Sequence, residues 1–417
     1  LTIKGVDNSW AVGDTLNIND QGDTDNNFYN TSFTRGSLSV SFTGIETYTI
    51  NAGSGNNTLS STSLPGGMNF TYNGGAMVDT VTLNVPTGNV VLNGAAGNDV
   101  MNVAAASLAA GSFTIANGED GDDTIIQHAG TTFADATTRV ELNGDGGADT
   151  LEVRASNQLN VTNMQGGANN DIIRVGHNPT GLNNVLGEVC VEGDAHDATP
   201  VVTQTIKTST NTLDFGDSLV FNDFNDVDNN VYNLSATTFQ RTAAGTPTGV
   251  VTYGTVERVV LNTGSAGGHD INVTSTAAAV NTTINGGTDA NDIDVTTTGD
   301  SSNVVINTGA AADDINIANT GMGTFLIATS AGSADIITQQ NSGTNSRTQY
   351  NAEDGTDTIH IQASGSGSVA DVVAGSNTDT INIGSAANSL DGLLGDVCVE
   401  GDSHDAGTTP LTIKGDT

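Results

Sequence analysis

The sequence predicts an all-β protein, a parallel β-solenoid (β-helix) whose rungs are about 22 residues long and whose chain holds two tandem copies of about 205 residues. Three observations lead to this prediction: a long repeat, a short repeat inside it, and a composition that disfavours helices. Gly, Asn and Thr are abundant, and these residues are poor helix formers. They suit short strands that are joined by many tight turns.

The long repeat is marked by an opening phrase and a closing phrase. The opening phrase ends in Thr-Ile-Lys at residues 1–4, 204–207 and 411–414. The closing phrase, residues 186–197, returns at 394–405 with ten of its twelve positions identical. We therefore expect copy one over residues 1–203, copy two over 204–410, and the start of a third copy over 411–417. Because the chain starts at Leu1 without Met, we expect a processed or truncated part of a longer array.

A short repeat runs inside each copy, where a turn rich in Gly, Asn and Asp leads into an Asp and then alternating apolar residues. Such residues alternate between the two faces of a strand. A unit of about 22 residues cannot bury its apolar row alone, but stacking units ~4.8 Å apart buries the rows together. We expect Asp79 to correspond to Asp292, and Asp99 to Asp314. The phrase begins at Asp79, Asp99, Asp123, Asp149 and Asp171 in copy one, and at Asp270, Asp292, Asp314, Asp335, Asp357 and Asp379 in copy two.

Two other architectures fit parts of the pattern. An antiparallel sandwich or barrel also has many short strands, and a chain rich in Gly, Asn, Thr and acids can be disordered. Self-similarity at a fixed period favours the solenoid. Residues 1–50 and 204–260 hold twelve of the eighteen aromatic residues, so each copy is expected to open with an aromatic-richer module before the rungs of 51–203 and 261–410. The pattern leaves open whether these modules belong to the solenoid or cap it.

The charge is strongly acidic, with 47 Asp and Glu against 10 Lys and Arg and a formal net charge of −37. Nucleic acids and anionic membrane surfaces need a basic footprint, so we expect neither as a partner. Cations are favoured instead. No run of about 18 apolar residues is present, so no membrane span is expected.

Three turns carry a resemblance to a known family. Residues 117–125, 143–151 and 166–172 resemble the haemolysin-type calcium repeat, Gly-Gly-x-Gly-x-Asp-x-apolar. More broadly, the chain resembles the large secreted β-strand-repeat adhesins and surface-layer proteins of bacteria. The resemblance implies a solenoid architecture and an extracellular or cell-surface location. The family repeats every nine residues whereas this chain repeats about every 22, so its calcium sites are not carried over.

Acidic clusters near the start of each copy are candidate Ca²⁺ sites. Closely spaced carboxylate oxygens are ligands that Ca²⁺ prefers. The alternative is a solvated turn rich in Asp and Asn. The candidate ligands are Asp20, Asp23 and Asp25 in copy one, and Asp223, Asp226 and Asp228 in copy two.

The closing phrase is a second candidate metal site, because thiolate, imidazole and carboxylate groups stand at alternate positions. In an extended strand these groups share one face, and Val189 and Val191 take the other. Alternate residues lie ~6.6 Å apart, too far for one strand to enclose an ion. A small buried cysteine beside a polar loop is the alternative. The residues are Cys190, Glu192, Asp194 and His196, and Cys398, Glu400, Asp402 and His404.

The only three lysines, Lys4, Lys207 and Lys414, all end the opening phrase. Such a lysine could anchor the junction by a salt bridge, form an isopeptide cross-link to Asp or Asn, or lie exposed beside an acid.

Function follows from these features. No Ser-His-Asp phrase, phosphate-binding loop or nucleotide fingerprint is present, and no isolated carboxylate pair stands out, so we expect no enzymatic activity. We expect an extracellular structural protein that forms a stiff acidic rod, filament or surface layer. It would self-associate head to tail through its repeat ends, with possible polysaccharide or cell-surface contact. The alternative is a β-helix that binds or degrades polysaccharide.

Overall fold

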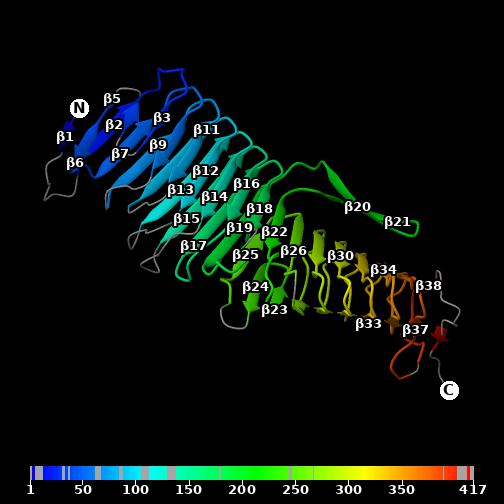
Figure 1. Ribbon diagram of the computed structural model, residues 1–417. Coiled ribbons are helices and arrows are strands. Elements are labelled where there is room, and N and C mark those ends of the chain that lie inside the picture. The colour runs from blue at the N-terminus through cyan, green and yellow to red at the C-terminus, as the bar shows by residue number, and fades with distance from the viewer. Residues whose placement is uncertain are drawn as a thin grey trace. The chain divides into compact units, whose positions relative to one another are not determined.

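The computed structural model describes residues 2–4, 13–30, 33–35, 38–61, 67–83, 88–104, 112–128, 138–177, 180–243, 247–265, 267–387, 389–401 and 411–413. These residues form strands and turns without a helix. Parallel strands stack as a β-solenoid of about 14 turns with a spacing near 22 residues, which confirms the predicted fold class (Figure 1). The parallel pairing rules out the antiparallel sandwich. No helix in the described part of the chain is long and apolar enough to cross a membrane.

The chain divides into two compact units. Unit 1 comprises Leu1–His177, Leu182–Asp197 and Gly249–Thr255, and unit 2 comprises Asn178–Gly181, Ala198–Thr248 and Val256–Thr417. Each unit has two main parallel sheets, and each rung contributes one strand to each. We call them the Asn sheet, in which most strands contain a repeated Asn, and the Asp sheet, in which most strands follow a repeated buried Asp.

In unit 1 the strands alternate between the two sheets along the chain. The Asn sheet contains β2 (Thr15–Asn19), β7 (Thr47–Asn51), β9 (Asn69–Asn73), β11 (Val90–Ala96), β13 (Phe113–Asp120), β15 (Arg139–Gly146), β17 (Val161–Ala168), β19 (Glu188–Ala195) and β25 (Val251–Gly254). The Asp sheet contains β3 (Phe28–Tyr29), β8 (Thr58–Ser61), β10 (Thr80–Leu83), β12 (Val100–Ala104), β14 (Thr124–His128), β16 (Thr150–Val153) and β18 (Ile172–Val175). Four short strands pair apart from these sheets: β1 (Thr2–Lys4) with β6 (Ser41–Thr43), and β4 (Thr34–Arg35) with β5 (Leu38–Ser39).

Unit 2 follows the same scheme. Its Asn sheet contains β22 (Ser218–Asn222), β26 (Arg258–Asn262), β28 (Asn281–Asn285), β30 (Asn303–Asn307), β32 (Phe325–Thr329), β34 (Arg347–Asn351), β36 (Val369–Val373) and β38 (Asp396–Glu400). Its Asp sheet contains β23 (Asn230–Leu234), β27 (Asp270–Val273), β29 (Asp292–Val295), β31 (Asp314–Ile317), β33 (Ile336–Gln339), β35 (Thr358–Ile361), β37 (Thr380–Ile383) and β39 (Leu411–Ile413), and β24 (Thr238–Ala243) pairs antiparallel to β23.

The core of each rung is filled by the inward side chains of both sheets. Along β10 the buried residues are Val81 and Leu83, and the register places them beside the buried Met101 and Val103 of β12. Each apolar row therefore continues from one rung to the next. Burying one such side chain contributes about 1.5–3 kcal/mol, which a single rung could not achieve without its neighbours.

The aromatic-richer modules belong to the solenoid in both units. In unit 1, β2 pairs in register with β7 and β7 with β9, so these strands join the Asn sheet. The rings of Tyr48 and Phe70 lie inside the coil, with their centroids 5.5 Å apart. In unit 2 the buried ring of Phe221 stacks on that of Phe239, with centroids 3.9 Å apart. The modules are thus rungs in which large rings replace aliphatic side chains.

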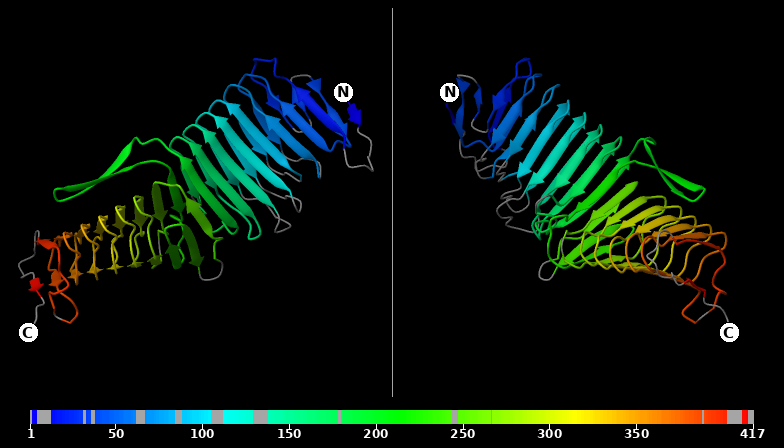
Figure 2. Two further views of the ribbon diagram at one scale, coloured as in Figure 1. Left: turned by 180° about the vertical axis from the view of Figure 1, so that it is seen from behind. Right: turned by 45° about the vertical axis from the view of Figure 1, so that its right-hand side comes forward.

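A hairpin of β20 (Val201–Ile206) and β21 (Ser209–Asp214) runs along the stacked strands of unit 2 (Figure 2). Its side chains bond to successive Asn-sheet rungs. Asn211 Nδ2 donates to Asn303 Oδ1 at 3.0 Å, and Arg347 Nε donates to Ser209 Oγ at 3.1 Å. The hairpin therefore ties several rungs of unit 2 together.

Candidate functional site

Asparagine side chains of the Asn-sheet strands form a file within each unit, and we call these files the Asn ladder. Each Nδ2 donates to the Oδ1 of the Asn on the preceding rung, at 2.6–2.8 Å in unit 1 and 2.8–3.0 Å in unit 2. An Asn offers both a donor and an acceptor, so identical residues can bond in one direction without limit. The ladder contains Asn19, Asn51, Asn73, Asn93, Asn117 and Asn143 in unit 1, and Asn222, Asn262, Asn285 and Asn307 in unit 2.

A second file, the Asp ladder, runs along the start of the Asp-sheet strands. The backbone N–H of each ladder residue donates to Oδ1 of the Asp on the next rung, at 2.6–2.8 Å in unit 1 and 2.7–3.1 Å in unit 2. These carboxylates are all at most 2% exposed. The accepting residues are Asp79, Asp99, Asp123, Asp149 and Asp171, and Asp313, Asp335, Asp357 and Asp379.

Burial changes the titration of the Asp ladder. Loss of hydration raises the pKa of Asp99 and of Asp149 to about 7, because the charged form is disfavoured away from water. The same cause raises the pKa of Asp123, Asp335 and Asp357 to about 6. The hydrogen bond from the preceding backbone N–H acts in the opposite direction in each case. These five carboxyl groups of the ladder therefore have pKa values raised to about 6 or 7.

Glycine at one turn position makes room for the Asp ladder in unit 1. Gly118 follows the ladder residue Asn117, and a Cβ added to it would lie 2.2 Å from Asp123 Oδ2. Gly94 and Gly144 stand in the same relation to Asp99 and Asp149, at 2.3 and 2.4 Å. The Asn-Gly turns of the sequence thus serve both ladders.

The register corrects two expected correspondences between the copies. Asp292 and Asp314 are the first residues of β29 and β31. Asp292 pairs in register with Asp314, and Asp314 pairs in register with Ile336 of β33. The ladder residues on those rungs are the preceding Asn291 and Asp313. Neighbouring acids made the alignment ambiguous by one residue, and that shift moves a side chain from the ladder to the outer face.

In copy two, an arginine occupies the centre of the predicted calcium cluster. Arg241 Nη1 lies 2.9 Å from Asp223 Oδ2 and 2.8 Å from Asp226 Oδ2, and all three side chains are almost fully buried. The hydroxyl of Tyr232 also donates to Asp223 Oδ2, at 2.8 Å. The guanidinium therefore already neutralises these two acids, and the third predicted ligand, Asp228, is exposed.

The matching loop of copy one is closed by hydrogen bonds. Tyr29 donates to Asp20 Oδ2 at 2.8 Å, as Tyr232 does to Asp223. Asp23 Oδ1 accepts the backbone N–H of Asp25 at 2.9 Å. These contacts involve two of the three predicted ligands, and calcium binding there stays a prediction.

The closing phrase forms β19, in which Val189 and Val191 are buried and Cys190 and Glu192 face the other way, as the alternation predicts. Asp194 interrupts this alternation because its φ is +74°. Thr255 bonds both acids: its hydroxyl donates to Glu192 Oε2 at 3.1 Å and accepts the N–H of Asp194 at 3.0 Å. Predicted ligand His196 follows this turn and is half-buried.

In copy two, β38 (Asp396–Glu400) lies within the closing phrase. Cys398 is half-buried, and neither it nor Cys190 is in a disulfide. Glu400 is exposed and is engaged by Lys207, while Asp402 and His404 lie outside the described residues.

Lys207, at the tip of the β20–β21 hairpin, forms the salt bridge that was one of its three expected roles. Its Nζ lies 2.9 Å from Asp371 Oδ1 and also contacts Glu400. Hydrogen bonds with Glu400 and Asp371 raise the pKa of Lys207, so its charged form is favoured. The side chains of Lys4 and Lys414 lie outside the described residues.

One cluster of charged side chains on unit 1 has no counterpart in copy two. Glu152, on the outer face of β16, is 6% exposed and accepts from Arg154 Nη2 at 2.9 Å. Its other oxygen lies 2.7 Å from His177 Nδ1. His128 Nε2 lies 3.0 Å from Asn102 Oδ1, and burial and the nearby Arg154 lower the pKa of His128. No sequence pattern marks this cluster, because the register of the strands brings the two histidines to it from residues about 25 positions away.

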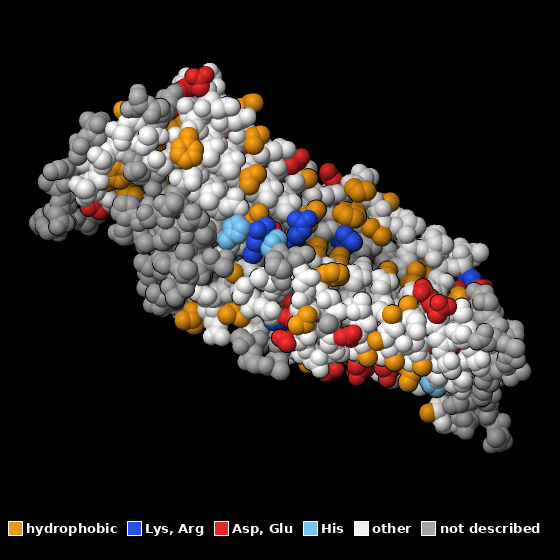
Figure 3. Space-filling model, viewed as in Figure 1, with side chains coloured by type: hydrophobic (Ala, Val, Ile, Leu, Met, Phe, Trp, Pro, Cys, Tyr) orange, Lys and Arg blue, Asp and Glu red, His pale blue; other side chains and the backbone are white. Residues whose placement is uncertain are grey.

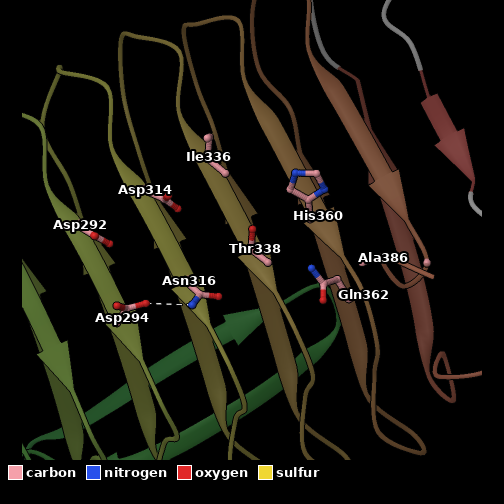
Figure 4. A pocket seen from close by; sticks show the side chains of 10 residues that line it. Asp292, Asp294, Asp314, Asn316, Ile336, Thr338, His360, Gln362 and Ala386 are labelled. Carbon is pink, nitrogen blue, oxygen red and sulfur yellow. Dashed lines mark hydrogen bonds between the residues drawn. The ribbon is translucent and has the colours of Figure 1, made fainter. Parts of the chain in front are cut away.

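On unit 2, the outer face of the Asp sheet holds an acidic groove of about 460 Å³ (Figure 4). Asp292 and Asp294 project from β29 and Asp314 from β31, and Asn316 Nδ2 donates to Asp294 Oδ1 at 3.0 Å. Burial and the neighbouring Asp294, Asp314 and Asp270 raise the pKa of Asp292. His360 of β35 also lines the groove.

Comparison with known proteins finds no family model, no curated protein and no solved structure that matches the chain.

Proposed function

We propose that this protein is an extracellular structural repeat protein, a stiff acidic rod that associates with further copies into filaments or a surface layer. The observation that carries the proposal is the pair of side-chain ladders. Both run from rung to rung along the stack, and each adds a hydrogen bond between neighbouring coils to those of the strands. Buried polar networks of this kind add rigidity when every rung supplies its partner.

The positions of the perturbed acids support a structural role over a catalytic one. Carboxyl groups with a pKa near 7 mark active sites in many enzymes. Here Asp99 and Asp149 are each 1% exposed, and their equivalents recur rung after rung in both units. A carboxyl group that is buried inside the solenoid cannot contact a substrate, so the raised pKa reflects the free-energy cost of burying its charged form.

The hairpin of unit 2 gives further support. Lys207, Ser209 and Asn211 bond to β38, β34 and β30, so the segment that opens copy two braces the rungs of that copy. An opening phrase that fastens onto its own copy suits a tandem array, in which each copy is reinforced in the same way.

Negative-stain electron microscopy of the purified chain over a concentration series tests the proposal. We expect straight rods of uniform width that lengthen or gather into bundles as concentration rises. Flexible or globular particles would overturn it, and so would discrete short particles at every concentration. Activity against acidic polysaccharides, measured on the same samples, would favour the alternative function.

A further inference from the structure

The outer face of the Asp sheet carries opposite charge in the two units. In unit 1, basic side chains lie on and beside three neighbouring strands, β14, β16 and β18, and we call them the basic row (Figure 3). The chain has seven arginines and six histidines, and two of each lie here. The basic row consists of His128, Arg154, Arg174 and His177.

Within the basic row, one arginine is available to a partner. Glu152 is committed to Arg154 and His177 through its two oxygens. Arg174 has no ion-pair or hydrogen-bond partner among the residues that the structure describes, and it is half-exposed. The free energy of desolvating an arginine is small when its guanidinium group then binds a carboxylate in a bidentate manner.

On the same face of unit 2, other rungs present carboxylates. Asp270, Asp292 and Asp314 are the first residues of β27, β29 and β31, they pair in register, and all are exposed. Asp294 lies beside them on β29. We call these four residues the acidic row; three of them flank or line the groove together with His360.

The two rows have the same spacing. The basic row places arginines on two adjacent rungs and the acidic row places aspartates on three, and adjacent parallel strands lie ~4.8 Å apart in any such sheet. Because both rows follow this strand spacing, cations of one row can face carboxylates of the other without deformation of either backbone. Most of the surface of a chain with net charge −37 repels a second copy, so a patch of positive sign favours one orientation.

We propose that the basic row of one molecule docks on the acidic row of a second copy, joining neighbouring rods side by side. This inference rests on the proposed structural function and adds a lateral contact to association at the ends. An exposed ion pair contributes only about 0–1 kcal/mol, so a single contact is weak. In an array with many copies, repeated contacts reinforce one another through effective concentration.

Sedimentation velocity on two complementary variants tests the contact. R154E/R174E makes the basic row acidic, and D292K/D294K makes the acidic row basic. Each variant alone then presents like charges on both rows, and we expect association at least about tenfold weaker than that of the natural chain, a change of ~1.4 kcal/mol. An equimolar mixture pairs each intact row with its natural partner, and we expect association to return. Raising salt from about 20 mM to about 500 mM, where the Debye length is ~4 Å, is expected to abolish it.

Two control variants test for effects of misfolding and of net charge. R174Q alone removes the charge without placing a second acid beside Glu152, whose contacts with Arg154 and His177 stay in place, so we expect weaker association with the fold intact. D391K/D396K changes the net charge as D292K/D294K does, at exposed acids outside both rows, and we expect it to retain lateral association. Circular dichroism confirms the fold of each variant.

The results separate this inference from the proposed function. If the mixture fails to associate, or if both variants associate like the natural chain, the lateral contact is wrong. A natural chain that stays monomeric at low salt but binds polygalacturonate through Arg154 and Arg174 would also overturn it, in favour of a polysaccharide ligand. Rods that still join end to end in micrographs would leave the structural function standing in each case.

Discussion

The backbone N–H of Asp99 donates to Oδ1 of Asp123 on the next rung at 2.6 Å, and both side chains are 1% exposed. The bond spans 24 residues of sequence and joins two successive coils outside the strand ladder. The same relation repeats along both units, so each coil depends on an acid supplied by its neighbour.

Replacing Asp123 tests this dependence. Asp123→Ala leaves the N–H of Asp99 buried without a partner, and we expect a loss of about 1–3 kcal/mol in the free energy of unfolding. Asp123→Asn is expected to be much milder, since Asn57 already accepts the N–H of Asn27 at the same kind of position. Denaturant unfolding of both variants provides the measurement. Equal stability of the alanine variant and the natural chain would contradict the role given to the ladder.

The Asp ladder also predicts how stability depends on pH. Burial raises the pKa of Asp99 and Asp149 to about 7, against a value of 3.8 in the absence of burial. The folded state therefore binds more protons than the unfolded state between these values, and stability rises as pH falls from 8 towards 4. We expect the Tm to increase over this window.

A matched variant separates the effect of the Asp ladder on the pH dependence of the Tm from the effect of general charge repulsion, which also weakens as pH falls. High salt screens exposed charges but not buried ones. In high salt the natural chain is expected to keep its pH dependence, and D99N/D149N is expected to have a flatter one. A Tm that falls between pH 8 and pH 5 would show that these carboxyl groups are charged in the folded protein.

The Asn ladder predicts that the loss in the free energy of unfolding on replacing an Asn depends on the position of that Asn in the ladder. Asn117 donates to Asn93 and accepts from Asn143, both at 2.8 Å, whereas Asn143 makes one such bond. We expect Asn117→Ala to cost about 1–3 kcal/mol and Asn143→Ala about half as much. Denaturant unfolding of the two variants compares them directly, and equal costs would argue against a directional ladder.

Removal of Arg241 tests whether the chain supplies its own cation to the cluster in copy two. Arg241→Met leaves Asp223 and Asp226 buried without their positive partner, and we expect a loss of about 3–5 kcal/mol. Arg139→Met is the control, because its salt bridge with Glu141 is largely exposed and is worth at most ~1 kcal/mol. If calcium holds the cluster instead, a chelator will lower the Tm of the natural chain and Arg241→Met will change it little.

Much of the fold follows from the sequence because it depends on local patterns. The turn, the Asp and the alternating apolar residues that follow mark each rung, and Asp79, Asp123 and Asp335 each immediately precede a strand, as expected. The aromatic modules were harder to place, because Phe221 and Phe239 could equally pack in a separate cap. Their position inside the coil depends on β22 pairing with β26, a contact between residues 40 apart.

The candidate sites depend on register, which composition does not specify. His177 reaches Glu152 only because β16 and β18 pair in register, which also places Glu152 beside Arg174. Likewise, the repeated Asn of most rungs is visible in the sequence, but spacings that vary from 20 to 40 residues hide the file that they form. The pairing of Arg241 with Asp223 has no sequence signal, since it arises where β24 folds back on β23.

A density map at side-chain resolution, from crystals of the chain, tests the central claim most directly. We expect parallel coils in which Asn51, Asn73 and Asn93 lie in single file on one sheet and Asp79, Asp99 and Asp123 on the other. Helical density, or strands β10 and β12 running in opposite directions, would contradict the stacked solenoid and both ladders with it.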